Sequence, residues 1–326
     1  MKDRYGREIN YLRISLTDRC NLRCVYCMPL HGLTFVPNEN LLTAQELEKV
    51  VRAAVDTGFK KVRLTGGEPT LRHDIVEVVH RLTHINGVEQ VVMTTNGYRL
   101  PHIAQELANA GLKRVNIHVD SLDKETLPQL MRLGSYDKAW AGIEAAEKAG
   151  LTPIKLNAVI TRGYNDDAAV ELARLTLKKN WQIRFIELMP FAGPTEIQLD
   201  HYVSSEETKI RIETELGPLF AVNDAKLDGE ARVYRLAAAE GTIGFISPVS
   251  NPYCDDCNRM RLTADGRMRM CLLSDKEINF KHTLRNGGTH QDLVNLFEKA
   301  IVGKPVGHQL KNGIYPESRT MSQIGG

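Results

Sequence analysis

Cys20-Asn21-Leu22-Arg23-Cys24-Val25-Tyr26-Cys27 directly follows a predicted first strand over residues 11–17. Three cysteines with gaps of three and then two residues can hold a cubane iron–sulfur cluster, whose fourth iron is left without a protein ligand. A catalytic metal site keeps such an open position, whereas a structural site is closed by four ligands. A zinc knuckle or three structural thiols are the alternatives, but zinc ligands usually form a CxxC pair with a fourth Cys or His nearby. The stretch therefore predicts a catalytic iron–sulfur cluster on Cys20, Cys24 and Cys27.

The other cysteines repeat this incomplete arrangement. The chain has six cysteines, and the remaining three are Cys254, Cys257 and Cys271, a CxxC followed by thirteen residues and one more cysteine. Two triads that are each one ligand short of four predict two clusters with an open iron each. Three disulfides would suit an extracellular domain. Here the first residues are charged and no apolar signal segment follows them, so metal ligation in a reducing cytoplasm is expected.

Composition limits the other functions. The chain has 326 residues, 42% of them hydrophobic, which is enough for one large domain with a smaller one. We expect a first domain over residues 1–220 and a second over residues 221–326. The net charge of +2 gives no support to nucleic-acid binding. No stretch is apolar enough to span a membrane.

Strands and amphipathic helices alternate along the first domain. Strands are expected over residues 11–17, 61–65, 88–94, 114–119, 153–160 and 182–188, and helices over residues 43–57, 74–83, 102–110, 137–149 and 166–178. Six βα-type units imply a parallel sheet. Because a closed TIM-type barrel needs eight, we predict an α/β fold with an incomplete (β/α)6 barrel. The second domain reads as a smaller α+β region of short strands, with a hairpin turn at Asp265-Gly266, that closes the open side.

Several strands carry polar residues on one face. Period 2 places these residues together: Arg13, Ser15, Thr17, Arg63, Thr65, Asn116, His118, Asp120, Lys155 and Asn157. Leaving an Arg or Lys buried without a partner costs about 3–5 kcal/mol. The cations must therefore pair internally, with Asp120 and Glu187 as available carboxylates, or face a bound anion. Cations outnumber carboxylates on these faces, which favours an anionic ligand in the barrel lumen.

Motifs cluster where barrel chemistry belongs, at the carboxyl ends of strands. They are Thr65-Gly66-Gly67-Glu68-Pro69, Thr94-Thr95-Asn96-Gly97 and Glu187-Leu188-Met189-Pro190, beside the first triad. A lone Gly-Gly pair is weak evidence, but glycines let a backbone approach a ligand closely. Several such sequences at corresponding places strengthen the prediction of a site.

With these motifs the sequence resembles the GTP 3′,8-cyclase family, radical S-adenosylmethionine (SAM) enzymes that start molybdenum cofactor biosynthesis. The first triad with aromatic Tyr26 and Gly-Gly-Glu-Pro match the radical SAM superfamily as a whole. The second triad running into Asn258-Arg259-Met260-Arg261, with the terminal Gly325-Gly326, matches the cyclases. The resemblance runs nearly end to end.

The resemblance implies an activity and a role for each matching residue. GTP would be converted to (8S)-3′,8-cyclo-7,8-dihydroguanosine 5′-triphosphate after a 5′-deoxyadenosyl radical takes the ribose 3′ hydrogen. The first of two 4Fe–4S clusters would bind SAM, and the second would bind the guanine base. Residues implied at SAM are Tyr26, Gly67, His118 and Met189. Residues implied at GTP are Arg13, Arg63, Thr94, Lys155, Arg259, Met260 and Arg261, and Gly325 and Gly326 are implied in catalysis.

His118 departs from the family pattern, which usually has a serine there. An imidazole can still donate or accept a hydrogen bond, so we expect SAM binding to survive. A strand-end histidine satisfied by its neighbours is an equal interpretation.

The resemblance also implies partners. They are an external electron donor and a downstream cyclic pyranopterin monophosphate synthase that takes the product. A homodimer is compatible with the resemblance, because several related enzymes dimerise. Two other functions remain open. One is a radical SAM enzyme with an auxiliary cluster that acts on a peptide or protein, and the other is a zinc-dependent binding module.

Overall fold

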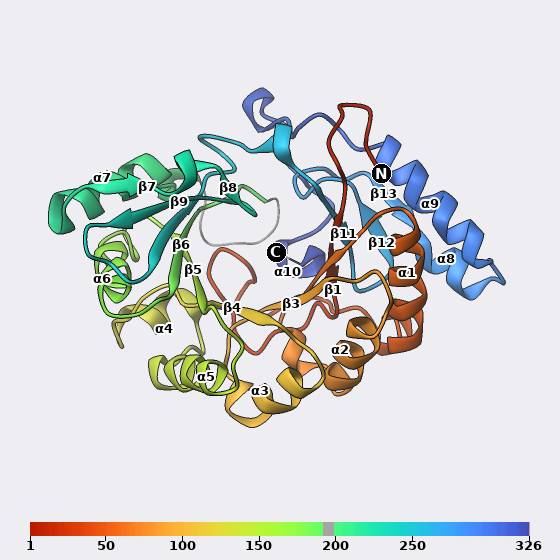
Figure 1. The fold of residues 1–326 in the computed structure, drawn as a ribbon, viewed down its shortest axis with the longest axis horizontal. Helices are drawn as coiled ribbons and strands as arrows, with labels where there is room; N and C mark the ends of the chain where they lie inside the picture. Colours follow the sequence, from red (N-terminus) through yellow and green to blue (C-terminus); the bar gives the residue numbers. More distant parts are fainter. Residues whose placement is uncertain (192–198, 326) are drawn as a thin grey trace.

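A computed structural model describes residues 1–191 and 199–325 and contains one curved sheet of thirteen strands. Six of its strands run parallel and follow one another in chain order across the sheet, and their helices lie on the outside (Figure 1). These strands are β1 (Tyr11–Ser15), β2 (Lys61–Thr65), β3 (Gln90–Thr95), β4 (Arg114–His118), β5 (Lys155–Ile160) and β6 (Gln182–Glu187). The six expected strands are confirmed, with ends that shift by one or two residues.

The C-terminal region lengthens this sheet at both edges. β10 (Thr242–Ile246) pairs parallel with β6, and β11 (Arg259–Leu262) pairs parallel with β1. Beyond them lie β9 (Ala231–Leu236), β7 (Leu219–Ala221), β8 (Leu227–Asp228), β12 (Arg267–Arg269) and β13 (Glu277–Asn279). Within the described residues β10 and β11 do not pair with each other, so the barrel stays open. The incomplete barrel is confirmed, but residues 221–326 continue its sheet and do not form a separate one.

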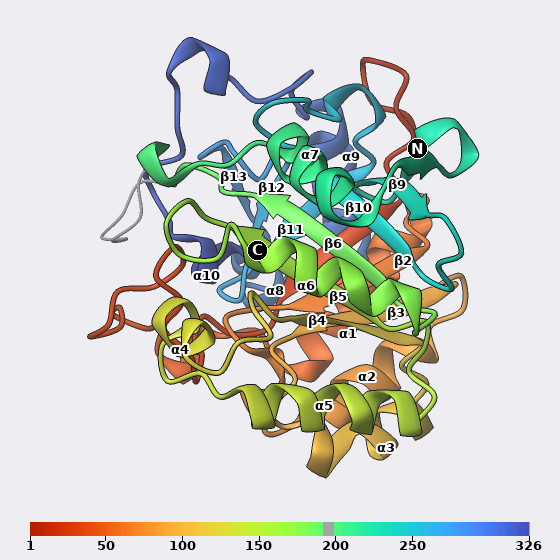
Figure 2. The ribbon, with the colours of Figure 1, turned by 90° about the vertical axis from the view of Figure 1, so that its left-hand side faces the viewer.

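Ten α-helices are described in these two stretches of the chain. They are α1 (Ala44–Asp56), α2 (Ile75–Thr83), α3 (Leu100–Asn109), α4 (Thr126–Met131), α5 (Tyr136–Lys148), α6 (Ala168–Arg174), α7 (Ser205–Leu216), α8 (Phe280–Arg285), α9 (His290–Val302) and α10 (Met321–Ile324). Figure 2 shows α5, α6 and α7 covering the outer face of the sheet. The short α10, by contrast, lies inside the barrel beside the C-terminus (Figure 1). Sequence periodicity gave no sign of α4, which is only six residues long.

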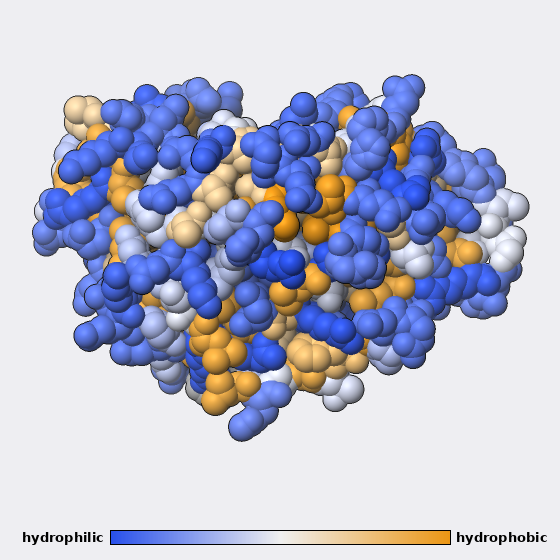
Figure 3. All heavy atoms as spheres, turned by 90° about the horizontal axis from the view of Figure 1, so that it is seen from below, coloured by the Kyte–Doolittle hydropathy of each residue, from blue (hydrophilic) through white to orange (hydrophobic). Residues whose placement is uncertain are grey.

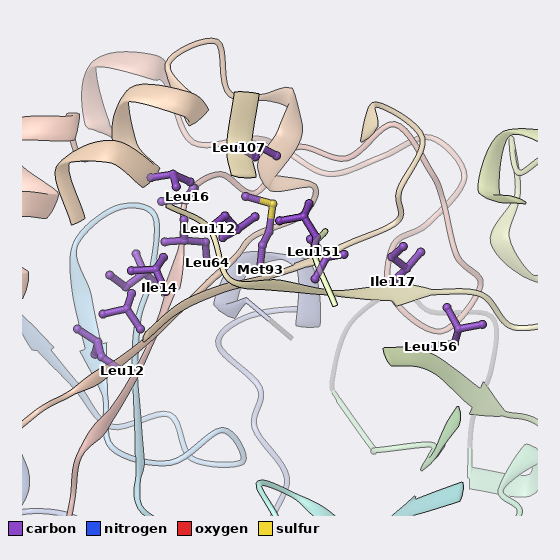
Figure 4. Packing of buried hydrophobic residues seen from close by; sticks show 14 of the residues in the cluster. Leu12, Ile14, Leu16, Leu64, Met93, Leu107, Leu112, Ile117, Leu151 and Leu156 are labelled. Atoms are coloured by element: carbon purple, nitrogen blue, oxygen red, sulfur yellow. The ribbon is translucent and has the colours of Figure 1, made fainter. Parts of the chain in front are cut away.

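The hydrophobic core lies between the strands and the outer helices. Side chains such as Leu12, Ile14 and Leu64 point from the strands toward helix residues such as Leu107 (Figure 4). Because side chains alternate along a strand, the residues between them point to the other face. That inner face carries the polar residues and surrounds the lumen.

The face of the molecule seen from below is mainly polar. Hydrophilic side chains cover most of this face and apolar ones form scattered patches (Figure 3). Across residues 1–191 and 199–325, none of the helices combines the length and the apolar character needed to cross a membrane.

Candidate active site

A cavity in the lumen collects residues from the carboxyl ends of the parallel strands. Its lining includes the first cysteine triad, Tyr26, Gly67, His118, Met189 and the cations Arg13, Arg63, Arg184 and Arg261. The motifs that the sequence placed at separate strand ends therefore meet at one site. This is the arrangement that parallel strands impose, because their carboxyl ends lie at the same end of a barrel.

The first triad lies on the loop after β1, held by its neighbours. The N–H of Val25 donates to the carbonyl of Leu130 at 2.9 Å, which ties the loop to α4. All three thiols line the cavity and none forms a disulfide. Burial and the nearby Glu68 raise the pKa of Cys20 to about 11, and burial raises the pKa of Cys27 to about 12. Such thiols are thiolates only when a metal centre holds them.

The donor set suits an iron–sulfur cluster. Three cysteine thiols line one cavity, and thiolates are the ligands that hold such clusters.

Gly67 lets the triad loop approach β2. A Cβ on Gly67 would lie 2.2 Å from the carbonyl oxygen of Arg19, so only glycine fits there. The N–H of Gly67 donates to Thr17 at 2.6 Å, and that of Glu68 donates to Arg19 at 2.7 Å. The Gly-Gly-Glu sequence thus fixes where the loop leaves β1.

Glu68 joins the ends of β2 and β3. Its carboxylate accepts from the backbone N–H of Thr70 at 3.0 Å, the hydroxyl of Thr95 at 2.7 Å and the N–H of Asn96 at 2.7 Å. Burial raises the pKa of Glu68, and these donors oppose that rise.

His118 contacts Tyr26 and Asp120. The Tyr26 hydroxyl donates to Asp120 at 2.6 Å and contacts His118 Nε2, which lies 3.0 Å from the same carboxylate. Burial disfavours the imidazolium, but Asp120 outweighs it and raises the pKa of His118. His118 is thus satisfied by neighbours and also lines the cavity, so both interpretations of this residue have support.

Cations dominate the rest of the lumen. Arg63 donates to Thr94 at 3.0 Å and to the hydroxyl of Tyr11. Sequence analysis missed Arg184, which is 3% exposed and pairs in register with Asn157. Strand alternation could have identified Arg184, because the same period-2 rule places it on the lumen face.

The carboxylates that pair with these cations are Asp228 and Glu230. Lys155 and Arg184 lie 2.7 and 3.1 Å from Asp228. Arg13 and Arg259 lie 3.1 and 3.2 Å from Glu230. Burial raises the pKa of Glu230, but the arginines outweigh burial and hold it well below its usual range.

The expected internal partners, Asp120 and Glu187, are engaged elsewhere. Asp120 accepts from Tyr26 and from the N–H of Val159 at 2.8 Å. Glu187 accepts from the backbone N–H groups of Ser205 and Val249 at 2.9 and 3.0 Å. The lumen cations thus have carboxylate partners within the protein, the alternative to a bound anion. These partners are Asp228 on β8 and Glu230 in the turn before β9, and not Asp120 and Glu187.

The second triad lines an adjoining cavity. Cys254, Cys257 and Cys271 surround it, and Arg261 lines this cavity and the lumen cavity. The cavities of the two triads therefore adjoin at Arg261. Met260 lies on the opposite face of β11 from Arg259 and Arg261, fully buried in the core, so its side chain does not reach the lumen.

The C-terminal tail enters the lumen. Arg261 donates to the carbonyl of Gly325 at 2.5 Å. Gly325 has φ +73°, and a Cβ there would lie 2.3 Å from the Thr65 hydroxyl, so glycine is required. Gly326, the other residue expected in catalysis, lies outside the described residues.

Comparisons with known proteins agree with this geometry. The profile of the radical SAM superfamily matches residues 14–176, and that of Molybdenum Cofactor Synthesis C matches residues 181–310. The chain is 46% identical to a GTP 3′,8-cyclase of Pelotomaculum thermopropionicum and 47% identical to one of Moorella thermoacetica, in both cases over 100% of each chain.

A solved structure shares the fold. SuiB of Streptococcus suis, in a crystal structure with S-adenosylmethionine, superposes with a TM-score of 0.62 at 16% identity, over 89% of this chain and 65% of SuiB. Identity this low supports the fold alone. The full-length relatives decide the family: this chain belongs to the GTP 3′,8-cyclase family of the radical SAM superfamily.

Proposed function

We propose that this protein converts GTP to (8S)-3′,8-cyclo-7,8-dihydroguanosine 5′-triphosphate, the first step of molybdenum cofactor biosynthesis. The observation that carries the proposal is a cation-lined lumen whose cavity adjoins a second one, with a cysteine triad in each. The similarity to GTP 3′,8-cyclases over the whole chain supports it.

The family implies a 4Fe–4S cluster and SAM, and the first triad has the ligands to hold that cluster. When bound, cluster and SAM supply the 5′-deoxyadenosyl radical that takes the ribose 3′ hydrogen. The chain's own residues position the reactants and exclude water. Tyr26, Gly67, His118 and Met189, which line the same cavity, would border SAM.

We assign a second 4Fe–4S cluster to Cys254, Cys257 and Cys271, with guanine at its open iron. The triphosphate would extend into the lumen toward Arg13, Arg63 and the other cations. Guanidinium groups suit phosphate oxygens because their N–H groups match them in pairs. Thr94 would bind GTP beside Arg63, which donates to its hydroxyl, and the Gly325 tail lies against Thr65.

The partners follow from the reaction. An external electron donor is needed to reduce the first cluster, and a downstream cyclic pyranopterin monophosphate synthase would consume the product. We place the enzyme in the cytoplasm, where thiols stay reduced, and a homodimer is compatible with this function.

The test is anaerobic reconstitution with iron and sulfide, followed by incubation with reductant, SAM and GTP. We expect 5′-deoxyadenosine and a cyclised GTP product together. Cys20→Ala should abolish both, because it removes the ligand set for SAM. Cys254→Ala should abolish the cyclised product while the first triad keeps its iron.

SAM cleavage without GTP consumption in the reconstituted protein would contradict the proposal. It would instead favour another radical SAM reaction, for example on a peptide. A colourless protein that contains zinc after purification without oxygen would favour a binding module.

A further inference from the structure

Lys304 is a buried lysine beside the second cysteine triad. It follows α9, is 3% exposed and lines the triad's cavity. Its Nζ donates to the carbonyl of Arg259 at 2.8 Å, to the carbonyl of Met270 at 2.7 Å and to Cys257 Sγ at 3.5 Å. The three donors of the ammonium group are therefore all used.

Within the described residues, the contacts of Lys304 Nζ are with two backbone carbonyls and one cysteine sulfur, and none is with a carboxylate. A buried cation needs a compensating charge, because desolvation of an ammonium group is costly. Two carbonyl groups offset only part of this cost. The remaining candidates for a counter-charge are the thiolates of the triad, and Cys257 is the one in contact.

Lys304 also joins the segments that carry the cysteines. Arg259 lies two residues after Cys257, and Met270 immediately precedes Cys271. The segment of Cys254 is linked to the chain just after Lys304 through Arg7. This arginine donates to the carbonyl of Cys254 at 2.8 Å and to that of Val306 at 2.7 Å. Residues 304–306 therefore connect all three ligand segments.

We propose that Lys304 is a positioning residue for the second iron–sulfur cluster, and that its N–H···S contact to Cys257 and its positive charge raise the reduction potential of that cluster. The inference rests on the proposed function, because it requires the second triad to hold a cluster. Its physical basis is that hydrogen bonds to ligand sulfurs and nearby net charge set cluster potentials.

The test is a potential measurement on the full-length protein, reconstituted without oxygen and titrated by EPR. Lys304→Met removes the charge and the donor, and Lys304→Arg keeps both. Lys281→Met is the matched control, because Lys281 also donates to a backbone carbonyl, that of Asn40, and lines neither triad cavity. A variant with all three first-triad cysteines changed to Ala isolates the signal of the second cluster.

We expect Lys304→Met to shift the midpoint potential of the second cluster to more negative values and to leave that of the first unchanged. Lys304→Arg and Lys281→Met should keep the wild-type potential. A second cluster that assembles in Lys304→Met with wild-type potential would overturn the inference.

If Lys304→Met fails to fold, Lys304→Gln replaces it, since the amide keeps polar contacts with the two carbonyls but carries no charge. Loss of iron from the second triad alone, with restoration by Lys304→Arg, supports the positioning role. If the variant without the first triad binds no cluster at all, the assignment of a second cluster fails, and this outcome is distinguishable from a failure of the Lys304 inference.

Discussion

We expect Lys155 to make GTP binding dependent on pH. Its side chain is almost fully buried in the lumen, 2.7 Å from Asp228. Burial and the nearby Arg184 lower the pKa of Lys155 to about 8, although Asp228 opposes the shift. In the proposed function this ammonium faces the triphosphate, so the protonated form is the one that binds GTP.

The size of the effect follows from the charged fraction. A group with a pKa of about 8 is about nine tenths protonated at pH 7 and about one tenth protonated at pH 9. Bound phosphate favours the charged form, so GTP must bring a proton onto Lys155 when the free site is neutral. GTP should therefore bind with nearly full apparent affinity well below pH 8. Between pH 7 and pH 9 the apparent affinity should fall by about tenfold, which is about 1.4 kcal/mol of binding free energy.

The assay is isothermal titration calorimetry with GTP and reconstituted protein, without reductant or SAM so that no turnover occurs. Two buffers with different ionisation enthalpies report the number of protons taken up on binding. Lys155→Arg is the control, because a guanidinium stays charged throughout this range. Titration of GTP and of the other lumen groups affects both proteins alike and cancels in the comparison.

Equal pH slopes for the wild type and Lys155→Arg would refute the reasoning. Heats at pH 8.5 that do not depend on the buffer would refute it as well, because no proton would then be taken up.

Three further changes test other parts of the site. Glu230→Gln removes the carboxylate that lies 3.1 Å from Arg13 and 3.2 Å from Arg259. The nucleotide-free protein should lose about 3 kcal/mol in urea unfolding while GTP binds more tightly in calorimetry, and unchanged values for both would contradict the pairing. Glu68→Gln replaces a carboxylate that accepts from several buried N–H and O–H groups by an amide. It should lower the free energy of unfolding by about 2 kcal/mol in the same experiment and weaken SAM binding. Wild-type stability would argue against the role of Glu68 in joining the strand ends. His118→Ser removes the contacts to Tyr26 and should weaken SAM binding by less than about tenfold, with GTP binding unchanged. Loss of GTP binding would contradict the placement of His118 at SAM.

The features that depend on short-range spacing could be predicted from the sequence. The gaps within Cys20–Cys27 define a ligand set because a few residues of loop limit how far the thiols can separate. The lumen face followed from the alternation of side chains along each strand, which places Arg13 on the same face as Ser15, and Arg63 on the same face as Thr65. The need for glycine at position 67 could be predicted for the same local reason, because a residue without a side chain lets another backbone segment come close.

The charge balance of the site was decided by the tertiary structure. Arg13 and Glu230 are 217 residues apart in the chain, and nothing in the pattern around Glu230 indicates that it lies in the lumen. Lys304 is likewise an ordinary lysine in the sequence and becomes a neighbour of Cys257 only through packing. The same is true of Met260, whose burial depends on β11 pairing with β1.

The sequence by itself therefore determined the chemistry that the site can hold: two cysteine triads, the strand order of the barrel and the sign of charge in the lumen. Only the tertiary structure decided how the open sheet is extended at both edges and which anions compensate its cations. The physical reason is the distance along the chain over which each effect acts. Ligand spacing and side-chain alternation act over a few bonds, whereas the compensation of a buried charge depends on whichever group folding brings within a few ångströms.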